Sequence, residues 1–248
     1  MRILRQLRPL SLLALVALGA CNIDSATSPF GSSLAARKPR NPPPPPPPAP
    51  LHDPILFVHG WNASSATFST MASRFKADGW TDAEIVNWSY NYRQSNATTA
   101  AQIKAKVDSI LTVTGATHVD IITHSMGTLS ARYYIRNLGG DGKVDALVSL
   151  GGANHGTNTA FFCVDTSCVE MRPNSTFVSN LNSIDETWGT TTRYATWWTS
   201  CDTVINPTSS TALNGALNTQ TACMDHSALH EDATVYGQVK SWILPPLP

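Results

Sequence analysis

Three side chains in this sequence are of the types that together activate a hydroxyl: Ser125, Asp202 and His226. A serine hydroxyl cannot attack a carbonyl carbon unaided, so it needs a histidine as general base, and the histidine needs a carboxylate to orient it. Ser125 stands in Thr123-His-Ser-Met-Gly127, a variant of Gly-x-Ser-x-Gly with threonine at the first position. In that motif a sharp turn from a strand into a helix exposes the serine hydroxyl. The motif therefore predicts that Ser125 is a nucleophile.

The residues around the motif predict the strand and the helix that such a turn requires. Residues 119–122 are mostly apolar, as in a buried strand, and Leu129 and Ile135 can face inward from a following helix. The helix would direct free backbone N–H groups towards charge that develops beside the serine. A serine near a glycine after a strand is more often only a turn, so the hypothesis depends on partners elsewhere in the chain.

Asp202 and His226 each follow a predicted strand. Residues 193–199 are predicted to form a strand that leads straight to Asp202. His226 follows a short strand predicted over 218–223 and precedes a closing helix predicted over 232–243. Enzymes with a serine on such a turn carry nucleophile, acid and base in this chain order.

Alternatives exist for both partners. Asp165 and Asp185 could supply the carboxylate, but they lie in a stretch with no preceding strand. His230 could be the base, although it falls at the mouth of the closing helix or inside it. We therefore expect Asp202 and His226 to complete the triad.

A tetrahedral intermediate needs N–H donors for its oxyanion. The backbone N–H of Met126, directly after the nucleophile, is one expected donor. The second is expected from Trp61, in the turn after the first strand, which ends in His59-Gly60. This chemistry requires neither a cofactor nor a catalytic metal.

The chain has five cysteines, an odd number. If Cys21, near the amino terminus, carries a lipid, four cysteines remain, and these can form two disulfides in an oxidising compartment. Cys163 and Cys168 lie five residues apart and are predicted to pair locally. Cys201 and Cys223 adjoin the loops of the predicted acid and base, so their disulfide would link those two loops.

The amino-terminal segment predicts export. Three arginines precede an apolar run over 10–20, which is the layout of a signal segment (residues 1–20) and is too short for a permanent membrane span. It ends in Leu18-Gly-Ala-Cys21, which resembles the lipobox of bacterial lipoproteins. We expect a lipid anchor at Cys21 and a cell-envelope location; the alternative is a secreted protein with an ordinary signal peptide and a chance cysteine.

Residues 21–52 are predicted to be a spacer, rich in serine and alanine and then in proline, with seven consecutive prolines that favour an extended helix. The catalytic domain is expected over 53–248. The whole chain is 42% hydrophobic and 14% charged, with a formal net charge of zero. That balance provides a full apolar core and gives no basic surface for a nucleic acid.

Strands and helices alternate along the first part of the domain. The pattern predicts a strand ahead of Gly60, a helix over 65–78, a strand over 84–90, a helix over 97–113, the strand, turn and helix over 118–138, and a strand over 144–150. This is an α/β class with a mainly parallel sheet flanked by helices. Such sheets carry their active sites beyond the carboxyl ends of the strands.

Four motifs resemble those of one family. They are Phe57-Val-His-Gly60, Thr123-His-Ser-Met-Gly127, Val148-Ser-Leu-Gly-Gly-Ala153 and His226-Ser-Ala-Leu229. They resemble the small bacterial lipases and esterases of the Bacillus lipase A type and their class 2 relatives, over about 53–160 and 194–243. The resemblance implies an α/β-hydrolase fold, the triad and oxyanion donors given above, and His226 rather than His230, because the family histidine is followed three residues later by leucine.

Two features depart from the family. Thr123 replaces the usual alanine, which does not affect the mechanism. Residues 153–193 are longer and more polar than in the compact Bacillus enzymes, and we expect one short helix over 174–181 and a small cap there. Lipase behaviour and chain-length preference are therefore not carried over.

The sequence predicts an exported, monomeric carboxylic-ester hydrolase, a lipase or esterase that acts on an ester or lipid substrate through an acyl-enzyme. One alternative keeps the triad but cleaves thioesters or amides, or transfers acyl groups. In the other alternative the chain is not an enzyme but a surface-anchored binding module on a hydrolase scaffold.

Overall fold

The computed structural model describes residues 52–244. The predicted signal segment, Cys21 and residues 21–51 of the spacer lie outside the described residues. Within the described part, no helix has the length and apolar character needed to cross a membrane.

The described residues form a six-stranded sheet in which every neighbouring pair is parallel, in the order β2-β1-β3-β4-β5-β6. The strands are β1 (Ile55–Val58), β2 (Ile85–Asn87), β3 (Val119–His124), β4 (Val144–Leu150), β5 (Arg193–Trp198) and β6 (Leu217–Gln220). All the residues of β1 and β3 are buried, as continuous apolar runs predict for strands covered on both faces. The parallel sheet that the sequence predicts is confirmed.

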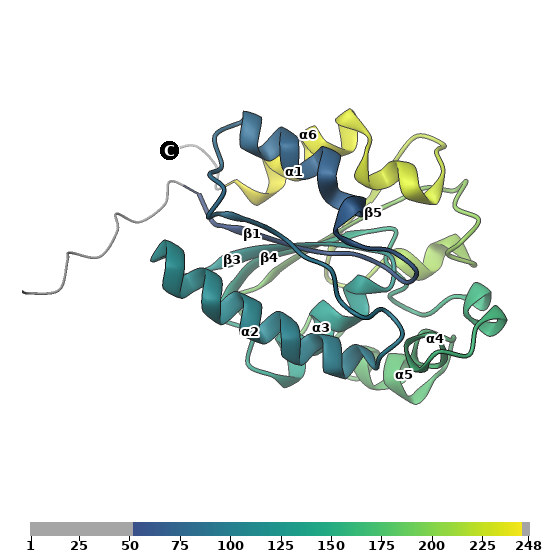
Figure 1. Ribbon diagram of the computed structural model, residues 1–248. Helices are drawn as coiled ribbons and strands as arrows, with labels where there is room; N and C mark the ends of the chain where they lie inside the picture. The colour runs from purple at the N-terminus through teal and green to yellow at the C-terminus, as the bar shows by residue number, and fades with distance from the viewer. Residues whose placement is uncertain (1–51, 245–248) are drawn as a thin grey trace, which may run out of the picture. The chain divides into compact units, whose positions relative to one another are not determined.

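Side chains alternate between the two faces of the sheet. In β1, Ile55 and Phe57 pack on one face with α1 (Ser69–Ala77) and α6 (Ala233–Ile243). Leu56 and Val58 pack on the other face, which helices α2 (Asn96–Thr114) and α3 (Gly127–Asn137) cover. Figure 1 shows the two helix layers on opposite sides of the sheet.

The strand order reverses between β1 and β3. From β1 the chain goes to one neighbour, β2, and then crosses to the other neighbour, β3. Ligands of parallel sheets bind in the crevice beyond the carboxyl ends of the strands at such a switch point. The turn after β1 (Gly60–Asn62) and the turn after β3 (Ser125–Met126) therefore meet at one place.

The segment between β4 and β5 contains more helix than the sequence predicts. It forms a 3₁₀ helix, η2 (Asn158–Phe162), and two short α-helices, α4 (Thr166–Glu170) and α5 (Thr176–Asn182). The sequence predicts only one helix there, over 174–181. The five residues of α4 are too few for a recognisable periodicity. The last strand also ends at Gln220, three residues earlier than predicted. His226 lies in a further short turn, η4 (His226–His230), ahead of α6.

This segment is fastened to α2 and α3. Arg132 of α3 is buried and donates to the carbonyl oxygens of Asn154 and Glu186 at 3.2 and 2.9 Å. Burial lowers the pKa of Arg132 to about 10. Glu170 accepts from the Ser95 hydroxyl at 2.6 Å and from the backbone N–H of Asn96 at 2.7 Å, at the start of α2. Two charged side chains thus fix a stretch whose periodicity is weak.

Candidate active site

Ser125 occupies a strained turn between β3 and α3. Its φ is +56°, a left-handed conformation that side chains other than glycine rarely adopt. Its backbone N–H donates to the Leu150 carbonyl oxygen at 3.0 Å, which ties the turn to the end of β4. A Cβ on Gly127 would lie 2.4 Å from the His59 carbonyl oxygen, and one on Gly60 would lie 2.8 Å from the Ser125 Cβ. Both glycines are therefore needed where the two turns touch.

Asp202 and His226 are paired. The Nδ1–H of His226 donates to Asp202 Oδ2 at 2.7 Å, and both side chains are buried. Asp202 Oδ1 accepts from the backbone N–H groups of Val204 and Ile205, both at 2.8 Å. The carboxylate is thus fixed on both oxygens, and it fixes the tautomer of the imidazole. Among the described residues, Nε2 of His226 has no hydrogen-bond partner.

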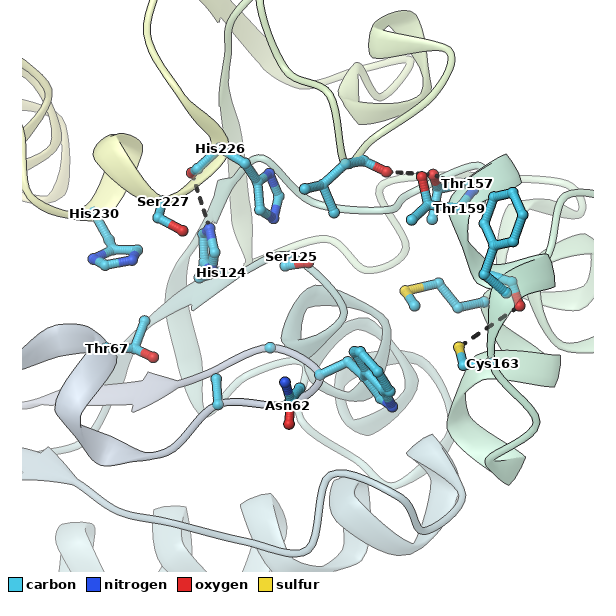
Figure 2. Close-up of a pocket in the computed structure, with 17 residues that line it drawn as sticks. Asn62, Thr67, His124, Ser125, Thr157, Thr159, Cys163, His226, Ser227 and His230 are labelled. Carbon is cyan, nitrogen blue, oxygen red and sulfur yellow. Dashed lines mark hydrogen bonds between the residues drawn. The ribbon is translucent and has the colours of Figure 1, made fainter.

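Ser125 and His226 line one cavity of about 420 Å³. Figure 2 shows the His226 ring and the Ser125 side chain in this cavity, with His124 beside them. The other walls come from the turn after β1, including Gly60 and Trp61, and from the segment after β4, including Met171. The cavity lies beyond the carboxyl ends of β1 and β3, where the strand order places it.

The alternative partners make other contacts, although His230 also lines the cavity. Asp165 Oδ2 accepts from the indole N–H of Trp61 at 2.9 Å, and Asp185 caps the backbone N–H of Thr187 at 2.9 Å. His230 packs against the rings of His124 and Phe68. Neither aspartate is hydrogen-bonded to a histidine, whereas Asp202 is.

His124 supports the loop that carries His226. Its Nε2–H donates to the His226 carbonyl oxygen at 3.1 Å. Burial, and then the neighbouring rings of His226 and His230, hold the pKa of His124 well below its usual range. Burial also lowers the pKa of His230. His124 is therefore a neutral donor that positions the backbone at His226.

The turn after β1 is held by His59 together with Tyr90 and Asp165, two residues that the sequence does not place there. The hydroxyl of Tyr90 donates to the His59 carbonyl oxygen, and the backbone N–H of Tyr90 donates to His59 Nε2 at 3.3 Å. His59 Nδ1–H can then donate to the Gly60 carbonyl oxygen at 2.8 Å. Asp165 orients the Trp61 ring. No local pattern links Tyr90 or Asp165 to this turn, because both contacts join distant parts of the chain.

Both predicted disulfides are present. Cys163 and Cys168 are bonded, with Cα atoms 5.9 Å apart, and close the loop between η2 and α4. Cys201 and Cys223 are bonded, with Cα atoms 5.2 Å apart. The second bond joins the residue before Asp202 to the turn that precedes His226.

Comparisons with known proteins give the family and the fold of the chain. A family model for lipase (class 2) matches residues 52–240. The mature form of a Bacillus licheniformis lipase is similar in structure over 83% of this chain and 96% of its own, with a TM-score of 0.67 and 16% identity. Aspergillus fumigatus lipase B is similar over 75% of this chain, with a TM-score of 0.62 and 14% identity, and this chain spans 51% of its length.

A third structure, a monoacylglycerol lipase of Paleococcus ferrophilus, is similar over 77% of this chain and 95% of its own, with a TM-score of 0.56 and 10% identity. Identities this low show the fold alone, which is that of α/β-hydrolases. The family rests on the match over residues 52–240. The family that the four sequence motifs resemble is thereby confirmed.

Proposed function

This chain belongs to the class 2 lipase family, and we propose that it cleaves carboxylic esters through an acyl-enzyme on Ser125. The observation that carries the proposal is that His226, which lines the same cavity as Ser125, is paired through Nδ1 with Asp202 at 2.7 Å. The single nitrogen of His226 without a partner in the described chain, Nε2, is the atom that a general base would use.

The reaction follows from these positions. Ser125 Oγ attacks the ester carbonyl carbon while His226 Nε2 takes its proton, and Asp202 stabilises the imidazolium that forms. The oxyanion accepts from the backbone N–H groups of Met126 and Trp61. His226 then gives the proton to the leaving alcohol. A water molecule then attacks the acyl carbon while the same nitrogen takes its proton, and His226 returns that proton to Ser125 Oγ as the bond from the acyl carbon to Oγ breaks and the acid leaves.

The cavity favours an apolar acyl group. Ala63, Ala160 and Met171 line it, and Phe162 stands at its rim with 91% of its surface exposed. The neighbouring Val164 is 89% exposed. Apolar side chains that face solvent beside an apolar cavity suit a substrate that brings its own apolar surface, as a lipid ester does.

A fluorophosphonate probe and a substrate series test this function together. The wild type should label, Ser125→Ala should not, and p-nitrophenyl esters of several chain lengths should be cleaved with a preference for apolar chains. Matched thioesters and amides separate the alternatives that keep the same triad. If the folded wild-type protein neither labels nor cleaves any of these substrates, the proposal is wrong and the alternative of a non-catalytic binding module is supported.

We also propose that the chain is exported and held at the cell envelope by lipid on Cys21. The support is the apolar run before Cys21 and the two disulfides, which are typical of oxidising compartments. Mass spectrometry of the mature protein should find a lipidated Cys21 at the amino terminus. An unmodified start at another residue would contradict the anchor.

A further inference from the structure

Three aspartates converge at the amino-terminal edge of the sheet, at the opposite ends of the strands from Ser125. Asp53 precedes β1, Asp120 is the second residue of β3, and Asp145 is the second residue of β4. One carboxylate oxygen of each lies within 4.8 Å of the other two. We propose that this carboxylate cluster binds a divalent cation that prefers oxygen ligands, with Ca²⁺ as the best fit.

Asp120 supplies an observation beyond the clustering itself. Its side chain is deeply buried, with the residue only 2% exposed, and among the described residues its Oδ1 atom has no hydrogen-bond partner. A buried carboxylate oxygen without a partner is costly unless a proton or a cation occupies the space in front of it.

The charges around the cluster leave room for two positive charges. Arg193 Nη2 donates to Asp145 Oδ2 at 2.5 Å, while its Nη1 donates to the Trp242 carbonyl oxygen at 2.9 Å. One guanidinium faces three carboxyl groups, and His118 and His52 near Asp53 add charge only when protonated. Three carboxylates and one arginine therefore carry two uncompensated negative charges, which one divalent cation would balance.

The crowding of the carboxyl groups also affects their pKa values. Burial, and then the charges of Asp53 and Asp145, raise the pKa of Asp120 well above its usual range. Burial and then Asp145 also raise the pKa of Asp53.

The ligand set indicates the kind of ion. Ca²⁺ binds carboxylate oxygens at about 2.3–2.6 Å, so two of its ligands can lie up to roughly 5 Å apart, and water completes its coordination. The cluster contains neither a cysteine nor a histidine, which disfavours the softer transition metals. Asp53 and Asp145 are half-buried, so the cluster opens to solvent on the side through which an ion would enter.

The cation would be structural. Asp120 and Ser125 are five residues apart along an extended strand, or roughly 16 Å. A cation at that distance touches no reacting atom, but it joins the starts of three neighbouring strands. We therefore expect it to raise thermal stability and to leave turnover unchanged.

Titration of the full-length, chelator-treated protein with CaCl₂ at pH 7.5, by calorimetry and by thermal unfolding, tests the site. The wild type should bind one Ca²⁺ per chain and gain at least several degrees in Tm. Asp120→Asn should weaken binding at least tenfold. Asp108→Asn is the matched control, because Asp108 is a surface acid paired with Lys104 and Lys143 outside the cluster.

Asp145→Asn provides a second variant if Asp120→Asn does not fold, and it too should weaken binding. The proposal is overturned if the wild type binds neither Ca²⁺ nor Mg²⁺ nor Mn²⁺ at millimolar concentration. It is equally overturned if both cluster variants bind Ca²⁺ as the wild type does. The cluster would then hold protons only.

Discussion

Each of the two edges of the parallel sheet carries a buried aspartate, and the two aspartates differ in their hydrogen-bond partners. At the carboxyl edge, Asp202 accepts from a histidine and from two backbone N–H groups, so both of its oxygens are satisfied. At the amino edge, Asp120 is buried as deeply, yet one oxygen has no partner among the described residues and two further aspartates face it. The first arrangement orients a neighbouring group for chemistry. The second creates an excess of negative charge that a ligand or a proton must balance.

The largest expected effect is at the carboxyl edge. Ser125→Ala removes the proposed nucleophile, so kcat should fall on the order of 10⁵–10⁶-fold. Tm should change little, because alanine keeps the left-handed turn and removes only the hydroxyl. Steady-state assays with an ester substrate, together with circular dichroism melts, measure both. Retained turnover in a folded variant would remove Ser125 from the mechanism.

Asp202→Asn should have the next largest effect. The amide keeps the shape but can no longer fix the protonated Nδ1 of His226, so kcat should fall on the order of 10⁴-fold. Asp185→Asn is the matched control, because Asp185 is the alternative acid and its carboxylate accepts hydrogen bonds from Thr187 in a turn. Equal losses in the two variants would refute the assignment of Asp202.

The sequence predicts which residues lie at the carboxyl edge, because each of them is marked by the strand that precedes it. Ser125, Asp202 and His226 each follow a strand, and the carboxyl ends of parallel strands meet at one edge. The order of strands and a short motif therefore suffice to bring distant residues together. The structure pairs Asp202 with His226 as expected, and their catalytic roles are the part that the assays above must establish.

The amino edge could not be predicted in the same way. Asp53 precedes β1, and Asp120 and Asp145 lie in β3 and β4, so the register of these three strands decides whether the aspartates meet. Asp120 lies opposite Ile55 and Ala146 in the sheet, one or two residues from the other two aspartates. A shift of one residue in either pairing would turn a carboxylate to the other face. The contacts of Arg132 and Tyr90 escaped prediction for the same reason, since they join segments far apart in the chain.

The disulfide between Cys201 and Cys223 should affect both stability and catalysis. It closes a loop of about 23 residues, so replacing both cysteines with alanine should cost roughly 3 kcal/mol of unfolding free energy. Because it joins the Asp202 loop to the His226 turn, kcat should fall as well, at temperatures where the variant is folded. The pair Cys163→Ala/Cys168→Ala is the comparison, because the short loop that it closes carries no residue of the proposed triad, so kcat should fall less than in the Cys201/Cys223 variant. Full turnover in the Cys201/Cys223 variant would limit that bond to stability.

The smallest expected effect is a pH dependence at the amino edge. In the calcium-free protein the pKa of Asp120 is higher in the folded state than in the unfolded state. The folded protein therefore binds the Asp120 proton more tightly than the unfolded chain does. The resulting stability is fully present below the unfolded pKa, near 3.8, and is lost as pH rises through the folded pKa. Asp120→Asn stays neutral throughout and escapes this loss.

In chelator, the Tm of Asp120→Asn minus that of the wild type should therefore grow as pH rises from 4 to 8, at about 2–4 °C per kcal/mol for a domain of this size. Asp108→Asn should give a difference that does not grow in this way, because Asp108 is exposed and its pKa is lowered by Lys104 and then Lys143. If the Tm difference between Asp120→Asn and the wild type stays constant with pH, the Asp120 carboxyl group of the wild type has the same pKa in the folded and the unfolded state. The two edges of the sheet would then not differ in the way the unpartnered oxygen implies.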